Sequence, residues 1–160
     1  MRPNRKFLVA MMIMLMAVII MNACAGKNPP TIAPDLAVNG KTLLQAVDAT
    51  QKAVADAEAR GAITREQAIK SMNVFKKVWT SAETAANSLE SLTTLTAGSA
   101  EAATVVEKIQ AALDVVDSGL LEALVPIGDE NTRAQVTKLA QSVSALISEI
   151  NRQILTIKGR

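Results

Sequence analysis

The feature that most constrains the fold is a series of apolar side chains, between residues 68 and 89, that are separated alternately by four and three positions. Its members are Ala68, Met72, Phe75, Trp79, Ala82, Ala86 and Leu89. Residues spaced in this way lie on one side of an α-helix, so the series predicts a long helix that packs against other helices in the manner of a coiled coil. No segment alternates apolar and polar residues, the pattern of a half-buried strand. We therefore expect an all-α fold.

Signals for helix ends divide the chain after Gly40 into four predicted helices, at about residues 41–60, 65–96, 100–124 and 131–157. Gly61 is a C-cap glycine after the first helix, and Thr64 with Gln67 forms a capping box before the second. Ser99 is the N-cap of the third helix. Pro126 and Gly128 form a turn before the fourth helix, whose N-cap is Asp129 or Asn131. Four long helices joined by short turns bury their apolar stripes most simply as an antiparallel up-and-down four-helix bundle.

Charge is distributed unevenly over the last two predicted helices. Between Val78 and Thr132 the chain holds nine acidic residues and one base, Lys108, whereas bases predominate after Thr132. We expect the acidic third helix to lie beside the more basic fourth as its antiparallel neighbour. Exposed ion pairs contribute under about 1 kcal/mol each, so the charges would favour an orientation more than they would stabilise the fold.

The first 24 residues have a different character from the rest. Three basic residues among the first six precede an apolar run, residues 7–21, that ends at Asn22 and Ala23. The run is shorter than the roughly twenty residues that a membrane-spanning helix needs. A basic start, a short apolar region and small residues at its exit are typical of an export signal.

The end of this segment, Met21-Asn22-Ala23-Cys24, resembles the lipobox of bacterial lipoprotein signal peptides. The resemblance implies that residues 1–23 are a signal peptide and that Cys24 is the lipidation site, carrying palmitate and related acyl chains that hold the protein on a membrane. It also implies a location in the cell envelope. In a diderm cell, aspartate directly after the cysteine would retain a lipoprotein at the inner membrane, and Ala25 at this position implies the outer membrane. In a monoderm cell the location would be the outer face of the cell membrane.

Two other interpretations of the segment remain open. Ala23-Cys24-Ala25 also fits the small-x-small site of ordinary signal peptidase, which would release a secreted protein, and an uncleaved segment would act as a membrane anchor. The chain has one cysteine, and an exported chain with a single thiol cannot form an internal disulfide. This favours lipidation of Cys24.

Residues 24–40 contain Pro29, Pro30 and Pro34, and we expect them to form an extended tether between Cys24 and a helical domain at residues 41–160. Removing residues 1–23 takes away three of the 17 basic residues and none of the 15 acidic ones. The basic balance of the whole chain therefore belongs to the signal, and we expect no affinity for nucleic acid.

The composition offers little for catalysis. The chain has no histidine, and its one cysteine is Cys24, so histidine-based triads and ordinary zinc sites cannot be assembled. Asp114 and Asp117 share a helix face, which we interpret as a solvated acidic surface. We expect neither an enzyme nor a bound cofactor.

Trp79 belongs to the apolar series, and we expect it in the core. Tryptophan is also enriched at protein interfaces, so Trp79 with the adjacent Lys76 and Lys77 is the candidate site of contact with a partner. The sequence thus predicts a membrane-anchored, non-enzymatic envelope lipoprotein that acts as a structural or interaction module, in contact with an unknown envelope protein or a second copy. The alternatives are an oligomerising helical envelope protein, from a phage or its host, that excludes infection or aids lysis, and a bundle that binds a small hydrophobic ligand.

Overall fold

The computed structural model describes residues 33–158, which form four helices: α2 (Ala33–Ala59), α3 (Arg65–Leu92), α4 (Ala100–Leu124) and α5 (Glu130–Lys158). The predicted signal peptide, Cys24 and the first part of the predicted tether lie outside these residues. No strand occurs between residues 33 and 158, so the expected all-α fold is confirmed.

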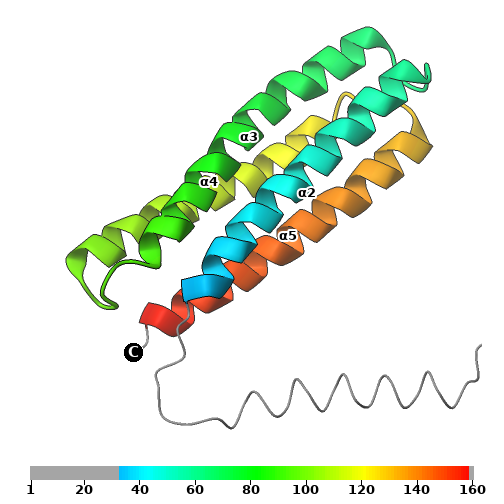
Figure 1. The fold of residues 1–160 in the computed structure, drawn as a ribbon. Coiled ribbons are helices and arrows are strands. Elements are labelled where there is room, and N and C mark those ends of the chain that lie inside the picture. The colour runs from blue at the N-terminus through cyan, green and yellow to red at the C-terminus, as the bar shows by residue number, and fades with distance from the viewer. Residues whose placement is uncertain (1–32, 159–160) are drawn as a thin grey trace, which may run out of the picture. The chain divides into compact units, whose positions relative to one another are not determined.

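The helices form the expected up-and-down bundle (Figure 1). Each helix packs against its neighbours in the chain, and α5 closes the bundle by packing against α2. The backbones of the diagonal pairs, α2 with α4 and α3 with α5, lie further apart across the core. The α3–α4 interface is the most extensive and the α4–α5 interface the least.

Local signals fix most of the helix ends as predicted. The Thr64 side chain accepts from the backbone N–H of Gln67, whose own side chain accepts from Thr64, which completes the capping box. The Ser99 side chain accepts from Ala102 at the start of α4. Of the two predicted caps for α5, Asp129 is used, because its carboxylate accepts from the N–H of Thr132 at 2.7 Å. These caps satisfy N–H groups that have no partner inside the helix.

The turn between α2 and α3 is closed by Gly61, with φ of 70°. The N–H of Gly61 donates to Glu58 and that of Ala62 to Ala57, the pair of bonds of a Schellman motif. Glycine accepts this left-handed conformation without the steric cost of a side chain, as the sequence predicts.

The end of α3 differs from the prediction. The helix was expected to reach residue 96, but it ends at Leu92. Beyond it the backbone makes tight i to i+3 bonds, and the hydroxyls of Thr93 and Thr94 donate to the carbonyls of Glu90 and Ser91. Threonine side chains that bond nearby carbonyls compete with helix continuation, which explains the early end.

The start of α2 also differs, because the helix begins at Ala33 and not at Lys41, so residues 33–40 are helix and not tether. Pro34 lies in the first turn, where its missing N–H costs no helical hydrogen bond, and Asp35 complements the helix dipole there. Leu36 is 1% exposed and extends the buried stripe of α2 by nearly two turns. Gly40, which was interpreted as a loop residue, is buried in this stripe.

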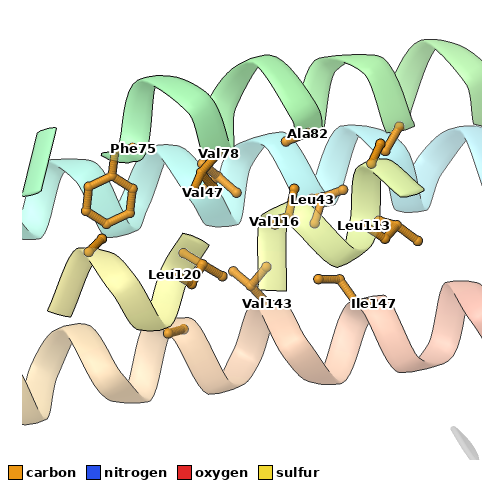
Figure 2. Close-up of a cluster of buried hydrophobic side chains, with 14 of the residues drawn as sticks. Leu43, Val47, Phe75, Val78, Ala82, Leu113, Val116, Leu120, Val143 and Ile147 are labelled. Carbon is orange, nitrogen blue, oxygen red and sulfur yellow. The ribbon is translucent and has the colours of Figure 1, made fainter. Parts of the chain in front are cut away.

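The buried side of α3 is rotated relative to the predicted series, toward residues that stand one position before its members. Five members of that series are buried as expected, but Met72 is 38% exposed and Trp79 is only half-buried. Because α3 packs against both α2 and α4, its buried sector is wider and turns toward α4. The additional buried residues are Ser71, Val78, Ala85, Ser88 and Leu92. Figure 2 shows Phe75, Val78 and Ala82 of α3 facing Val116 and Leu120 of α4.

Two glycines allow helices to approach closely. A Cβ placed on Gly119 of α4 would lie 2.5 Å from Cγ2 of Val78, and one on Gly40 would lie 3.1 Å from Cα of Ala86. Gly119 lies in the interior of α4, and the helix runs unbroken through it. Its role is to let α3 and α4 pack against each other.

The third and fourth predicted helices, α4 and α5, are neighbours as expected, but no ion pair joins them within residues 33–158. The ion pairs described there all lie within one helix: Lys52–Asp48, Lys70–Glu66 and Arg152–Glu149. Between α4 and α5 the Ser144 hydroxyl donates to Asp117 at 2.5 Å. The short connection at residues 125–129 therefore accounts for their adjacency, without support from charge pairs.

Candidate functional site

Trp79 lines a shallow groove between α2 and α3. The groove has a volume of about 410 Å³, and six side chains line it: Asp48 and Gln51 from α2, and Met72, Lys76, Trp79 and Thr80 from α3. Trp79 packs partly against the core and keeps part of its surface in this groove. The structure therefore brings two of the predicted contact residues, Trp79 and Lys76, together at one surface.

The wall of the groove that α2 provides is held in place by polar contacts. The Gln51 side-chain amide donates to the backbone carbonyl of Phe75 at 3.3 Å and so links the two helices. Asp48 accepts from Lys52 at 2.6 Å, and this hydrogen bond raises the pKa of Lys52 above its ordinary value. The indole of Trp79 therefore lies in a groove whose α2 side is formed by two polar side chains, Asp48 and Gln51.

Lys76 and Lys77 lie beside a second hollow of about 350 Å³, which Thr80 and Ser81 complete. The two hollows share Lys76 and Thr80, whereas Lys77 lines only the second. Both lysines are exposed, and neither forms an ion pair with another of the described residues. Two positively charged side chains that form no ion pair among the described residues therefore lie beside Trp79, across the groove from the Asp48 carboxylate.

An apolar extension of the groove was missed by the sequence reasoning. Ile69 is 51% exposed and Met72 38% exposed on the same side of α3 as Lys76. The spacing of these residues, 69, 72 and 76, is itself helical, so a second exposed stripe beside the buried one was detectable. Asp48 and Gln51 could not be assigned to the site, because their position depends on how α2 packs against α3.

The acidic residues of the described part of the chain do not form a cluster that could bind a metal ion. Among residues 33–158 no three histidine, cysteine, aspartate or glutamate side chains are close enough together to hold a metal ion. Asp114 is exposed, while Asp117 accepts the hydrogen bond from Ser144, so the two carboxylates have different surroundings. No helix of this part of the chain is both long enough and apolar enough to cross a membrane. The predicted lipidation site, Cys24, lies outside it.

Comparison of the chain with protein-family models, with curated proteins and with solved structures gives no significant match in any of the three cases.

Proposed function

We propose that this chain is a lipid-anchored protein of the bacterial cell envelope that binds another protein through the face around Trp79 and catalyses no reaction. The observation that carries the proposal is the half-buried Trp79 in an open groove, beside lysines that form no ion pair within residues 33–158. A tryptophan held in part by the core is rigid, so little conformational entropy is lost when its free surface is covered. Residues of this type dominate the binding energy of many protein interfaces.

The anchor would be the acylated Cys24. Buried acyl chains contribute about 0.8 kcal/mol per methylene group, and one short chain holds a protein only marginally. The several chains of a mature lipoprotein would keep the protein on its membrane. This supports a role that is exerted at a membrane surface.

The length of the chain sets how far the groove would stand from that surface. Residues 25–32 separate Cys24 from α2 and span at most about 28 Å when fully extended. The end of the bundle where α2 begins also holds the C-terminal end of α3, and Trp79 lies about 20 Å along α3 from that end. This length would allow the groove to meet a partner above the lipid headgroups.

The anchor is tested by the mass of the N-terminal fragment from the membrane fraction of the native host. We expect a fragment that begins at Cys24 with the added mass of acyl chains, and accumulation of the uncleaved precursor for Cys24→Ala. An unmodified N-terminus at Gly26, or an intact N-terminus at Met1 or Arg2, would contradict the proposal.

The binding face is tested with a photoreactive amino acid introduced at position 72, beside Trp79, in cells. A matched control is position 38, because Val38 is 59% exposed on α2 at the other end of the bundle. We expect a discrete crosslinked band from position 72 and none from position 38. Equal crosslinking from both positions would show that the face around Trp79 is not selective.

A further inference from the structure

Along α3, the face around Trp79 includes a strip in which apolar residues are followed by basic ones. We call it the basic strip, and it consists of Ile69, Met72, Lys76 and Lys77. Toward the N-terminal end of α3 it is apolar, with Ile69 51% and Met72 38% exposed. One turn further toward the C-terminal end it is positively charged, since Lys76 and Lys77 are exposed and unpaired among the described residues. An occupant of this strip must present an apolar group next to negative charge.

The outer face of α4 has this character, and we call it the acidic strip: Asp114, Leu121, Glu122 and Val125. Leu121 is 64% and Val125 77% exposed, at the C-terminal end of the helix. Toward the N-terminal end the same face carries Asp114, and Glu122 adjoins Leu121; neither carboxylate forms an ion pair within residues 33–158. The acidic strip therefore complements the basic strip in both hydrophobicity and charge.

The order of the two strips specifies the direction of contact. Along α3 the apolar part comes first and the bases follow, whereas along α4 Asp114 comes first and the apolar part follows. The two patterns match when the helices are antiparallel, with Met72 opposite Leu121 and Lys76 closest to Asp114. In a parallel pairing, apolar side chains would instead face charges, and the charged groups would lose water without a partner.

The heights of the strips in the bundle are also matched. Inside one molecule α3 and α4 are antiparallel neighbours, and the Ser71 hydroxyl donates to the carbonyl of Ala123 at 2.9 Å. The residues around position 71 and those around position 123 thus lie at the same level. An antiparallel contact between α3 of one copy and α4 of another therefore keeps both bundles level and pointing the same way.

We propose that the occupant of the Trp79 face is the acidic strip of a second copy of this chain, so that copies associate side by side on a membrane. The inference rests on the proposed lipid anchor for its biological setting, because copies anchored by their N-termini must all point the same way. The matched direction and height of the two strips meet this requirement without any tilt of one bundle against its neighbour.

The contact does not close on itself. The Trp79 groove lies between α2 and α3, and α4 is diagonally opposite α2 in the bundle, so the two strips face different sides of the bundle. Two copies joined by one contact leave a free basic strip at one end and a free acidic strip at the other. Contacts of this head-to-tail type build rows or rings.

The proposed contact is small, because each strip consists of four residues. Interfaces below about 1,200 Å² of buried surface are typical of weak and transient complexes. Confinement to a membrane raises the effective concentration of neighbouring copies and strengthens a weak contact without new interactions. We therefore expect association in membranes and dissociation after dilution in detergent.

The experiment uses two differently tagged full-length copies that are expressed together, one with Met72→Cys and the other with Leu121→Cys, and mild oxidation of the membranes. A disulfide-linked dimer that carries both tags is expected. The unsubstituted chain, treated in the same way, shows any disulfide made by Cys24 itself. Crosslinking no stronger than for the exposed pair Val38→Cys with Leu155→Cys, on α2 and α5, would overturn the inference.

A register control uses Glu107→Cys in place of Leu121→Cys. Glu107 is exposed on the same face of α4, about 21 Å from Leu121 along the helix. We expect at least a tenfold weaker crosslink to Met72→Cys, because only a shifted or inverted pairing would bring the two positions together. Equal crosslinking of Glu107→Cys and Leu121→Cys would contradict the level, antiparallel arrangement.

Charge exchange tests whether the strips recognise each other. In the Met72→Cys copy, Lys76→Glu should lower the crosslink at least fivefold, and Asp114→Lys in the other copy should restore it. A loss without restoration, or no change, would overturn the pairing of the strips.

The same membranes separate the failure of this inference from the failure of the proposed function. Acylated Cys24 without a specific crosslink would leave the lipid anchor standing and remove the second copy as the partner. A specific crosslink in a chain that is not acylated would keep the contact and remove the lipid anchor. Capture of a different protein by Met72→Cys alone, without the second tag, would overturn self-association.

Discussion

The packing of α3 against α4 makes a sharp prediction about Gly119, since glycine in a helix interior normally invites replacement by alanine. In an open site Gly119→Ala should stabilise the helix by about 1 kcal/mol. Here the added methyl group would lie 2.5 Å from Cγ2 of Val78, a fully buried side chain. We therefore expect the substitution to destabilise the bundle.

The magnitude follows from two opposing contributions. Val78 is β-branched and held in one rotamer on a helix, so it cannot turn away from the new methyl group. Overpacking of this kind costs about 1–3 kcal/mol, from which the gain of about 1 kcal/mol in helix propensity is subtracted. The expected net loss in the free energy of unfolding is about 1 kcal/mol.

The assay is urea unfolding of the full chain in mild detergent, followed by helical circular dichroism, with a double-mutant cycle. In a Val78→Ala background the clashing methyl group is absent, so Gly119→Ala should there stabilise by about 1 kcal/mol, a coupling of about 2 kcal/mol between the sites. Ser118→Ala, at the exposed neighbouring position, should change stability by less than about 0.5 kcal/mol. Equal stabilisation by Gly119→Ala in both backgrounds would refute the close approach of α3 and α4.

Three other predictions concern the helix ends and the second close contact. Gly40→Ala should destabilise by about 1 kcal/mol in the same urea assay, because the new Cβ meets the backbone of Ala86 at 3.1 Å, which has little freedom to move. Thr64→Ala should lower the free energy of unfolding by about 1 kcal/mol through loss of the capping box; an unchanged urea midpoint would contradict the cap. Hydrogen bonds from Thr132, first from its side chain and then from its backbone, hold the pKa of Asp129 below its ordinary value. The ionised carboxylate therefore stabilises the fold above that ordinary value, and Asp129→Asn should remove a loss of stability that the natural chain shows between about pH 5 and 2.

The parts of the fold that depend on local chemistry were predictable from the sequence. The capping box at Thr64 and the glycine cap at Gly61 involve residues a few positions apart, so no knowledge of distant contacts was needed. The start of α2 was not predictable in this way. Gly40 has the appearance of a loop residue until its close contact with Ala86 is known.

The site was predictable only in part for the same reason. The periodicity of α3 showed that Trp79 belongs near the core, but two overlapping stripes share that helix, and the packing of α4 decides which of them is fully buried. Ser71 and Ser88 are polar and small, so the sequence did not single them out as core residues, although both are buried. Trp79 is consequently displaced to the edge of the core and becomes available as a contact surface.

The most direct test of a contact face around Trp79 is fluorescence quenching, because Trp79 is the only tryptophan in the chain. Its accessibility to iodide would be measured for the full-length protein, first in dilute detergent and then in densely packed membrane vesicles, with Met72→Glu as the matched variant. We expect quenching in detergent, protection of at least threefold in dense vesicles, and loss of that protection in Met72→Glu. Equal quenching of the natural protein under both conditions would contradict a contact at this face.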